Sequence, residues 1–431
     1  MLSLIREHRR FFLGTTLAAL ALRLFFFFHF PTVTDDSRIY ADLATNWLQH
    51  GIYGQTQLTQ PVQQIVPTDA RLPGYPAFLA AIFWLFGAGN FKAVLLMQIL
   101  LDLATCLIVA DLARRTVSER AGRIAFVLAA LCPFLANYAS AVLTETLEIL
   151  FTTLALDGAT AALNRMRDAR AGIGALKLWA ATGVAIAACI LLRPDGGILL
   201  AATAFYLVVL AWKKNADNRN IADVLAAGII VVVFALAPLA PWTIRNFRTL
   251  HHFQPLAPRY ANETDELVPR GFIRWVKTWI ADYNQAQEMT PELDARFGNV
   301  AADRIRGHRG RYYVVLPLLR VADMWLRPRT EILPPDVRWW EFNDDAKQSV
   351  MAVGFGLLNL AYVVGALLAL VRRPSGIRWA GLLVGFLLLR SAFLGTLENP
   401  EPRYTLECYP AIVVLASSLL AGRTRHGEKP A

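Results

Sequence analysis

Long apolar runs alternate with short polar segments along most of the 431-residue chain. Each run is close to the roughly 20 residues that a helix needs to cross the hydrocarbon core of a bilayer. The runs lie at 11–30, 91–112, 122–138, 140–162, 177–193, 196–212, 222–242, 349–371, 379–396 and 405–421. The pattern predicts an all-α polytopic membrane protein. It excludes a soluble enzyme, and it disfavours a β-barrel, whose strands alternate over about 10 residues.

Arginine and lysine gather in six of the segments that flank these runs. Because cytoplasmic loops of membrane proteins are enriched in these residues, all six are placed inside. This gives ten crossings with both termini inside, or eleven if the short apolar stretch 74–88 also crosses. Pro73 and Pro76 at the start of that stretch favour a broken or re-entrant segment. The clusters are Arg6/Arg9/Arg10, Arg114/Arg115/Arg120/Arg123, Arg165/Arg167/Arg170, Lys213/Lys214/Arg219, Arg372/Arg373/Arg378 and Arg423/Arg425/Lys429.

The same topology predicts three parts. Residues 1–242 form an N-terminal transmembrane catalytic module that includes a first outer loop, 31–73, and residues 243–348 form a larger outer segment. Residues 349–431 form the C-terminal transmembrane helices. The run 11–30 is long for a signal-peptide core and has no A-x-A site after it, so we expect an uncleaved span.

The first outer loop contains the sequence DDSRIYADLATNWLQHG, which has the period of an amphipathic helix. Ile39, Leu43 and Trp47 fall on one face, as in a helix that lies on a membrane surface. Asp35 or Asp36 is expected to cap its N-terminus, and Gly51 is expected to end it.

The larger outer segment is polar but rich in tryptophan, as in a domain that lies close to the membrane interface. Its Thr290-Pro291 pair predicts the start of a helix with proline at the first helical position. The tryptophans are Trp275, Trp279, Trp325, Trp339 and Trp340.

Composition agrees with this assignment: 55% of the residues are apolar and 18% are charged. The net charge of +10 does not indicate nucleic-acid binding, because the basic residues are dispersed over short loops. The four cysteines have no metal-ligand spacing and are interpreted as small core residues. The sequence has no P-loop, no GxSxG and no GxGxxG in a strand context, so nucleoside-triphosphate chemistry and serine hydrolysis lack support.

Unusual polar motifs collect on the side opposite the basic clusters, which indicates one outward-facing polar site. Acidic residues at helix starts can instead serve the helix: Asp35 or Asp36 as a cap, Glu145 as a favourable charge near the helix N-terminus. The motifs are the Asp35-Asp36 pair, RLPGYP (71–76), LTETLE with Glu145 and Glu148, LLRPDGG with Arg193 and Asp195, PWTIRN with Arg245, and ENPEPRY with Arg403 and Tyr404.

Two arginines, Arg23 and Arg390, fall inside apolar runs. A charge at that depth is costly and usually faces the bundle interior with a partner. One interpretation is a buried ion pair with Asp102 or Glu148. The other is a socket for an anionic lipid headgroup, which the planar fork of arginine suits.

The motifs, in this order and on one side, resemble those of the GT-C superfamily of integral-membrane glycosyltransferases. The chain is most similar to the bacterial family-39 group, which is akin to protein O-mannosyltransferases and to the aminoarabinose transferases of lipid A. The resemblance covers nearly the whole chain, and it implies a GT-C-like helical bundle.

The resemblance also implies roles for individual residues. Asp36 would be the catalytic acid residue of the first outer loop, with Asp35 as the alternative, and Glu145 would be the second outer acidic residue. Family members often carry an acidic pair separated by one residue, whereas this pair is adjacent, which counts against a metal role. The sequence requires no cofactor, and a divalent metal stays open. The donor lipid phosphate would meet Arg403, with Arg390, Arg71, Arg193 and Tyr404 as further candidates. Weaker substrate-binding candidates are Tyr40, Tyr75, Asp195 and Arg245.

Sugar nucleotides are made inside the cell, so an outward-facing site needs a lipid-anchored donor, for which a polyprenyl-phosphate sugar is the hypothesis. Asp36 would take the proton of an acceptor hydroxyl as general base. The hydroxyl would attack the anomeric carbon through an oxocarbenium-like state, with inversion. The acceptor is a lipid, a polysaccharide or a protein, and the site would face the outside of the cell (inner) membrane. No nucleic-acid partner is expected.

Two other function classes stay open on the sequence. A lipid or glycolipid transporter or flippase also has many spans and intramembrane charges, but such proteins often show inverted repeats, and none is seen here. A non-catalytic protein that binds polyprenyl lipids is the third interpretation.

Overall fold

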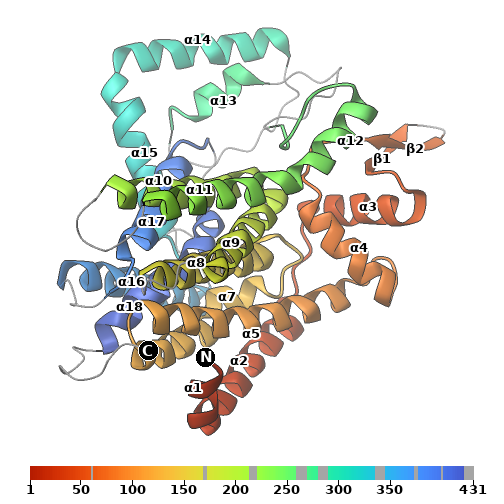
Figure 1. Cartoon of the computed structure of the whole chain (residues 1–431). Coiled ribbons are helices and arrows are strands. Elements are labelled where there is room, and N and C mark those ends of the chain that lie inside the picture. Colours follow the sequence, from red (N-terminus) through yellow and green to blue (C-terminus); the bar gives the residue numbers. More distant parts are fainter. Residues whose placement is uncertain are drawn as a thin grey trace. The chain divides into compact units, whose positions relative to one another are not determined.

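The computed structural model describes residues 1–59, 62–167, 172–212, 221–258, 269–279, 290–334, 345–372, 377–398 and 401–421. Within these ranges the chain is helical apart from loops and one antiparallel hairpin (Figure 1). Several residues of the basic clusters lie outside the described residues, as do Trp339 and Trp340. Those cluster residues are Arg170, Lys213, Lys214, Arg219, Arg373, Arg423, Arg425 and Lys429.

Eight helical segments of the described chain are long and apolar enough to cross a bilayer, which confirms an all-α polytopic membrane protein. Their bounds are α2 (Arg9–His29), α5 (Phe91–Thr116), α8 (Glu145–Arg167), α9 (Ile173–Leu192), η1 with α10 (Pro194–Gly196 and Gly197–Trp212), α11 with η2 and α12 (Ile221–Leu236, Ala237–Leu239 and Ala240–Leu250), α16 (Ala346–Arg372), and η4 with α18 (Pro402–Cys408 and Tyr409–Ala421). Two apolar helices are shorter, α4 (Gly74–Phe86) and α17 (Ala380–Gly395). The number of crossings, ten or eleven, stays a prediction.

The remaining described elements are short helices, one π-helical turn and two strands. They are α1 (Leu2–Glu7), α3 (Asp35–His50), β1 (Gly54–Thr59), β2 (Val62–Pro67), α6 (Glu119–Ala130), α7 (Pro133–Tyr138), α13 (Arg270–Val276), α14 (Pro291–Gly307), η3 (Arg311–Val315) and α15 (Leu316–Leu326).

The apolar run 122–138, which was expected to form one span, is not one continuous helix. It is divided into α6 and α7, with a break at Leu131 and Cys132. Pro133 explains the break, because a proline disfavours helical backbone at the residue before it and fits the first position of a new helix. Thr290 caps α14 and Pro291 occupies its first turn, as predicted.

The chain packs as two compact units. Unit 1 contains Met1–Ala257, Tyr362–Phe386 and Glu407–Ala431, and unit 2 contains Pro258–Ala361 and Leu387–Leu406. The two units group residues whose backbones lie close together, whereas the three expected parts were defined by the side of the membrane on which they lie. The division into three parts stays a prediction.

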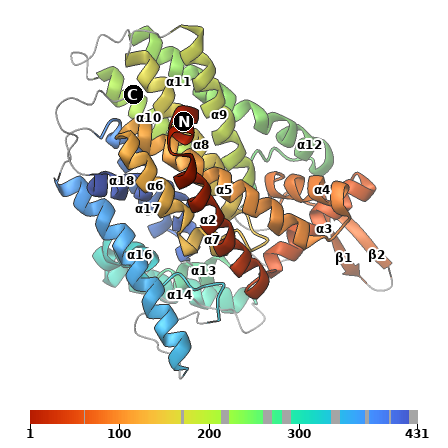
Figure 2. The same ribbon diagram turned by 90° about the horizontal axis from the view of Figure 1, so that it is seen from below.

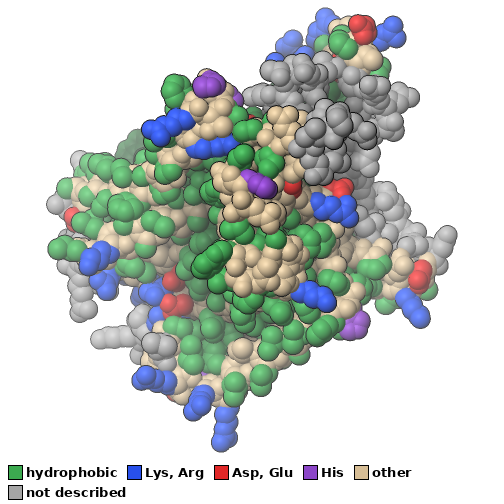
Figure 3. Space-filling model, turned by 90° about the vertical axis from the view of Figure 1, so that its right-hand side faces the viewer, with side chains coloured by type: hydrophobic (Ala, Val, Ile, Leu, Met, Phe, Trp, Pro, Cys, Tyr) green, Lys and Arg blue, Asp and Glu red, His purple; other side chains and the backbone are tan. Residues whose placement is uncertain are grey.

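In unit 1, α8 packs on both α5 and α9, α9 packs on α11, and α18 packs on α5 and α6. The apolar windows of α8 and of the segment that ends in α18 are 78% and 83% buried, whereas that of α2 is 22% buried. Figure 2 shows α2 alongside α5 and α7. The inner helices are therefore shielded by protein and the outer ones expose apolar side chains for lipid. Figure 3 shows such a face, on which hydrophobic side chains cover broad areas between scattered charges.

Arg23 on α2 forms a buried ion pair with Asp102 on α5. Arg23 Nη2 lies 2.6 Å from Asp102 Oδ2, and the two side chains are 0% and 3% exposed. The guanidinium also donates to the carbonyl oxygens of Ala19 and Ala130. The ion-pair interpretation of Arg23 is therefore confirmed, and its partner is Asp102.

The amphipathic helix of the first outer loop is α3, and its capping differs from the expectation. Thr34 is the N-cap: its hydroxyl accepts from Ser37 N, while Ser37 Oγ accepts from Thr34 N. Neither Asp35 nor Asp36 caps the helix, since both lie in its first turn. Gly51 ends α3 as predicted, with a φ of 69° that side-chain-bearing residues rarely adopt.

Two of the three apolar residues on this face of α3, Ile39 and Leu43, are covered by protein. Leu43 packs in a small core with Tyr53, Leu72 and Trp242, and Ile39 packs against it. The interpretation of this face as membrane-lying is therefore wrong for Ile39 and Leu43, because residues distant in sequence cover them. Trp47 is 40% exposed.

The β1–β2 hairpin follows α3 and was not predicted. Asp42 on α3 accepts from both the backbone N and the hydroxyl of Thr56 at 2.7 Å. Asn46, one turn further along α3, donates to Gly54 O at 2.9 Å. These bonds fix the hairpin to α3.

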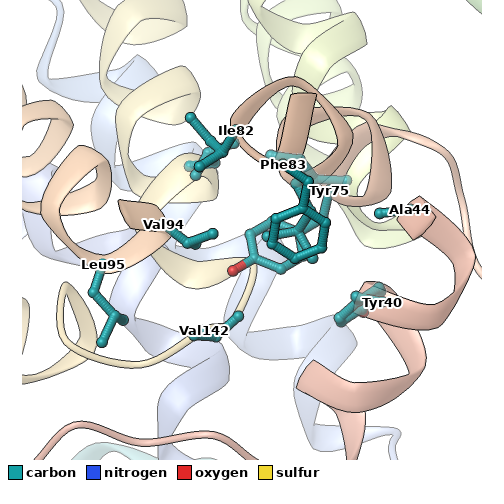
Figure 4. Close-up of a cluster of buried hydrophobic side chains, with 11 residues drawn as sticks. Tyr40, Ala44, Tyr75, Ile82, Phe83, Val94, Leu95 and Val142 are labelled. Atoms are coloured by element: carbon teal, nitrogen blue, oxygen red, sulfur yellow. The ribbon is translucent and has the colours of Figure 1, made fainter. Parts of the chain in front are cut away.

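A second core holds α3 and α4 against α5 (Figure 4). The rings of Tyr40 and Tyr75 meet edge to face with centroids 5.1 Å apart. The other buried members are Ala44, Leu79, Ile82, Phe83, Val94, Leu95, Val142, Leu147 and Leu192. The first outer loop therefore begins on a rigid platform.

In unit 2, α13 and α14 pack together. Asp294 on α14 accepts from the backbone N of Gly271 at 3.0 Å and of Phe272 at 2.8 Å. The ring centroids of Trp275 and Phe297 are 4.8 Å apart.

Candidate functional site

The first outer loop and the RLPGYP segment meet in an ion pair. Arg71 Nη2 lies 3.2 Å from Asp36 Oδ1, and the two side chains are 38% and 36% exposed. Asp35 points elsewhere: it is 93% exposed and pairs with Arg38 at 3.0 Å on the same helix. Of the two adjacent carboxylates, Asp36 is the one joined to a second motif.

The backbone of the RLPGYP segment is held from both sides. Tyr53 donates its hydroxyl to Arg71 O at 2.9 Å and to Leu72 O at 3.2 Å. Gly74 begins α4 against the end of α9, where a Cβ on Gly74 would lie 2.6 Å from Leu191 O. RLPGYP and LLRPDGG are thus in direct contact, and glycine is the residue that allows it.

Arg193 follows α9 and pairs with two carboxylates. Its Nη2 lies 3.1 Å from Asp195 Oδ2, and its Nε lies 3.6 Å from Glu148 Oε1. Glu145 and Glu148 both occupy the first turn of α8, as predicted, and both are buried. Arg193 therefore connects the start of α8 with the end of α9.

Tyr40 lies close to both ion pairs. Burial raises the pKa of Tyr40 to about 12, and the charged groups that act on it are Arg71, Asp36, Arg193 and Glu148. Its hydroxyl has no hydrogen-bond partner among the residues that the structure describes. It therefore stays protonated at neutral pH and is available to donate to a substrate.

Tyr75, the other tyrosine candidate, is fully buried. Its hydroxyl donates to Gln98 Oε1 at 2.7 Å, and Gln98 in turn donates to Ala141 O at 2.6 Å. This bonding makes Tyr75 a support of the site.

An apolar groove of about 490 Å³ opens next to RLPGYP. Four prolines and three aromatic side chains give it rigid walls. Its lining consists of Trp47, Gly51, Ile52, Tyr53, Pro67, Pro73, Leu191, Pro238, Pro241, Trp242, Arg245 and Thr249. Pro73 belongs to the RLPGYP segment itself, so the groove adjoins the turn that carries Arg71.

Arg245 from PWTIRN is the one charged side chain of this lining. It donates to Thr68 O at 2.8 Å and to Tyr53 O, the residues that flank the hairpin. Its guanidinium carbon lies 5.3 Å from the Trp242 ring centroid and 5.4 Å from that of Tyr53. Among the described residues it forms no ion pair, and Asp69 is the carboxylate that acts on it from further away. It is therefore a cation held by neutral oxygens and aromatic faces.

His252 and Asp69 were not identified from the sequence. His252 Nε2 lies 2.8 Å from Asp69 Oδ2, which ties the end of α12 to the loop before Arg71. The hydrogen bond to Asp69 raises the pKa of His252. The signal was weak, since a single histidine and a single aspartate 183 positions apart form no motif. In the described part of the chain, no three His, Cys, Asp or Glu side chains group as metal ligands would.

Arg403, Arg390 and Tyr404 belong to unit 2. Arg403 Nε lies 2.5 Å from Glu401 Oε2, and its guanidinium stacks 5.4 Å from the Tyr404 ring centroid. Arg390 donates to Tyr404 O at 3.3 Å. Arg329, which the sequence did not single out, donates to Pro402 O at 2.7 Å and to Thr405 Oγ1 at 2.6 Å. The turn that carries Arg403 is thus held by two buried arginines.

The family model of dolichyl-phosphate-mannose-protein mannosyltransferases matches residues 68–253. The match contains RLPGYP, Glu145, LLRPDGG and PWTIRN. Asp36 and Arg403 lie outside it. No curated protein matches the chain in sequence.

Solved structures share the fold. The oligosaccharyltransferase AglB from Archaeoglobus fulgidus, in complex with an inhibitory peptide and a dolichol-phosphate, matches with a TM-score of 0.56 and 14% identity over 96% of this chain and 50% of that one. The Archaeoglobus fulgidus oligosaccharyltransferase in complex with Zn and sulfate matches with a TM-score of 0.54 and 15% identity over 95% and 48%. ArnT from Cupriavidus metallidurans, bound to undecaprenyl phosphate, gives a TM-score of 0.45 and 14% identity over 95% and 77%.

This chain therefore spans about half the length of the oligosaccharyltransferases that it matches. The matches confirm the resemblance to the GT-C superfamily, and the fold is that of a GT-C membrane protein. They lend no support to the transporter alternative.

Proposed function

We propose that the chain is a glycosyltransferase that moves a sugar from a polyprenyl-phosphate donor to an acceptor hydroxyl at the outer face of the cell (inner) membrane. The observation that carries the proposal is the Asp36–Arg71 ion pair beside a rigid apolar groove. The attacking hydroxyl needs a carboxylate as base, the donor phosphate needs a cation, and the isoprenoid chain needs an apolar groove.

The groove supports a lipid-linked donor. Proline and aromatic walls suit an isoprenoid chain, and Arg71 and Arg245 would meet the phosphate, where negative charge builds up as the sugar leaves. AglB, which shares the fold, was solved with a dolichol-phosphate. Arg193 is the weaker phosphate candidate, because Asp195 and Glu148 already pair with it. The assignment of Arg403, Arg390 and Tyr404 to the phosphate rests on their motif and stays a prediction.

Asp36 is proposed as the general base. It would take the proton of the acceptor hydroxyl while the hydroxyl oxygen forms a bond to the anomeric carbon. The bond from that carbon to the phosphate oxygen breaks, and its electron pair leaves with the polyprenyl phosphate. Phosphate is a good leaving group, so no general acid is needed, and a single displacement inverts the configuration.

The other acidic and phenolic groups would orient the reactants. Arg71 fixes the direction of the Asp36 carboxylate, and the Tyr40 hydroxyl would donate to the sugar or the phosphate. Asp195 pairs with Arg193, and Glu145 is buried in the first turn of α8. Both carboxylates would orient the acceptor or hold a divalent ion. The class of acceptor stays open among lipid, polysaccharide and protein.

The test is transfer by the purified protein in vesicles. Polyprenyl-phosphate hexoses and pentoses are offered with a membrane lipid extract, and released polyprenyl phosphate is quantified by mass spectrometry. We expect Asp36→Asn to lower turnover by about 100-fold or more, as for the loss of a general base. Asp35→Asn, the adjacent exposed carboxylate, is the matched control and should stay close to wild type. Full turnover in folded Asp36→Asn protein would refute the proposed base, and no turnover by wild type on any donor would refute the proposed function.

A further inference from the structure

Helix α15 in the outer segment has a buried stripe and, opposite that stripe, an exposed apolar face. Leu316, Arg320 and Met324, spaced by four residues, form its buried stripe. The other side, with the preceding turn, exposes large apolar residues. Their exposed fractions are Val314 55%, Val315 47%, Leu318 63%, Leu319 42% and Leu326 41%. A continuous exposed apolar face of this kind marks a surface that contacts another protein or a membrane.

The buried side of α15 packs on two membrane helices. Trp325 donates from Nε1 to Ser391 Oγ on α17 at 3.0 Å, and Asn359 on α16 donates to Trp325 O at 2.7 Å. At the other end of α15, a Cβ on Gly395 of α17 would lie 3.0 Å from Pro317 O. Figure 1 shows α15 next to α17. These contacts place α15 alongside apolar helices rather than above them.

Positions along α16 and α17 indicate how deep in the membrane α15 lies. The apolar part of α16 begins at Val350, and Asn359 is nine residues further on, or about 14 Å at 1.5 Å per residue. On α17, Ser391 lies four residues below Gly395, or about 6 Å. Half of the hydrocarbon core is about 15 Å thick. The C-terminal end of α15 is therefore well inside one leaflet.

The chain after α15 is irregular but buried in protein. Arg327, Pro328, Arg329 and Thr330 are all buried. Arg329 donates to Asn359 Oδ1 at 3.1 Å as well as to Pro402 and Thr405, and Arg327 pairs with Asp323 at 2.5 Å. Non-helical backbone is tolerated at membrane depth only where protein or a water-filled cavity surrounds it. Residues 327–330, which follow α15, are surrounded by protein and therefore meet this condition.

The chain immediately before α15 and its apolar face is basic. Arg309 and Arg311, immediately before the apolar face, are exposed. Arg311 reaches back to Thr278 O at 3.1 Å, and Arg309 has no carboxylate partner among the described residues. Arginine at the boundary of an apolar segment places its charge at lipid phosphate level.

We propose that residues 311–326 enter the outer leaflet as a re-entrant half-helix. Phospholipid acyl chains cover the face formed by Val314, Val315, Leu318 and Leu319, and phospholipid phosphates meet Arg309 and Arg311. The segment 243–348 is then not wholly outside the membrane. This inference stands independently of the proposed enzymatic activity.

The test is membrane depth measured by spin labels. The full chain, with its four cysteines replaced, is reconstituted into vesicles of phosphatidylethanolamine and phosphatidylglycerol. Single cysteines at 311, 314, 318 and 326 carry a nitroxide, whose accessibility to oxygen and to a water-soluble nickel chelate is compared. Leu357, 59% exposed on α16, is the lipid-facing control, and Val300, 44% exposed on α14, is the water-facing control.

We expect the ratio of oxygen to nickel accessibility to rise from position 311 to position 326. The ratio at position 318 should be close to the ratio at position 357. Values at 314, 318 and 326 that match Val300 would overturn the proposal. Gel filtration of each labelled protein identifies any variant that has lost its fold, and positions 315 and 319 replace it.

Discussion

Arg71 and Asp36 are 35 positions apart in the sequence, and their side chains form a 3.2 Å ion pair that joins α3 to the RLPGYP turn. Both groups are about one-third exposed, so solvent and substrate reach them. The pair is therefore poised to contact a ligand, and its contribution to stability is small.

Replacing Arg71 should separate binding from folding. Arg71→Gln is expected to raise the KM for a polyprenyl-phosphate sugar about tenfold or more, because a charged hydrogen bond to phosphate is lost. The unfolding free energy should change by less than about 1 kcal/mol, as for an exposed ion pair. Steady-state kinetics in vesicles and thermal unfolding measure the two effects. Arg38→Gln, which breaks the exposed Asp35 pair, is the control, and an equal rise in KM there would contradict the assignment.

Gly74→Ala should damage the contact between α4 and α9. The added Cβ would lie 2.6 Å from Leu191 O and 2.7 Å from Leu191 C, both backbone atoms that cannot rotate away. Overpacking of this kind costs about 1–3 kcal/mol. Thermal unfolding of the purified protein reports it. Gly228→Ala on α11 is the matched control, because nothing lies within 4 Å of its Cβ position; equal midpoints for the two variants would show that the contact is not tight.

The Arg23–Asp102 pair predicts a non-additive mutant cycle. Arg23→Met alone leaves Asp102 buried without its cation and should destabilise the protein by about 3–5 kcal/mol. The double variant Arg23→Met with Asp102→Leu should recover most of that loss, since an apolar pair avoids desolvating two charges. Unfolding midpoints of the single and double variants test this. Additive losses would mean that the two charges do not act on each other.

The His252–Asp69 contact predicts a pH dependence of defined sign. The hydrogen bond to Asp69 raises the pKa of His252 in the folded protein above the unfolded value of about 6.5. The added stability is then fully present below about pH 6.5 and is lost as the pH rises through the folded-state pKa. The difference in unfolding midpoint between wild type and His252→Gln should therefore shrink between pH 6 and 9. A difference that grows with pH would refute the charged contact.

The sequence predicted those features that depend on local pattern. Apolar runs located most of the helices, Gly51 and the Thr290-Pro291 pair marked two helix ends correctly, and Asp102 was one of two partners named for Arg23. Each of these signals comes from a few neighbouring residues or from the cost of an isolated charge in an apolar run.

The errors arose where distant residues decide the structure. Thr34 caps α3 because Ser37 completes a reciprocal pair, and the adjacent aspartates obscured that signal. Leu43 on the apolar face of α3 is covered by Trp242, about 200 positions away, which periodicity cannot reveal. The hairpin is held by Asp42 and Asn46, and these residues acquire that role only once the hairpin lies against α3. The contact between Gly74 and Leu191 likewise joins residues that are distant in sequence, so no local pattern predicts it.

The pairing of Arg23 with Asp102 has a consequence for biosynthesis. The partners are 79 positions apart, and at about 5–20 residues per second the ribosome needs roughly 4–16 s to add that length. During this interval α2 holds an arginine in the bilayer, which costs about 2.5–3.5 kcal/mol near a helix centre. Leu24 and then Phe25, Phe26, Phe27 and Phe28 follow Arg23 and help to keep α2 inserted. The helices leave the translocon in sequence order, so α2 gains its ion-pair partner, and the stability that the pair gives, only when α5 has been inserted.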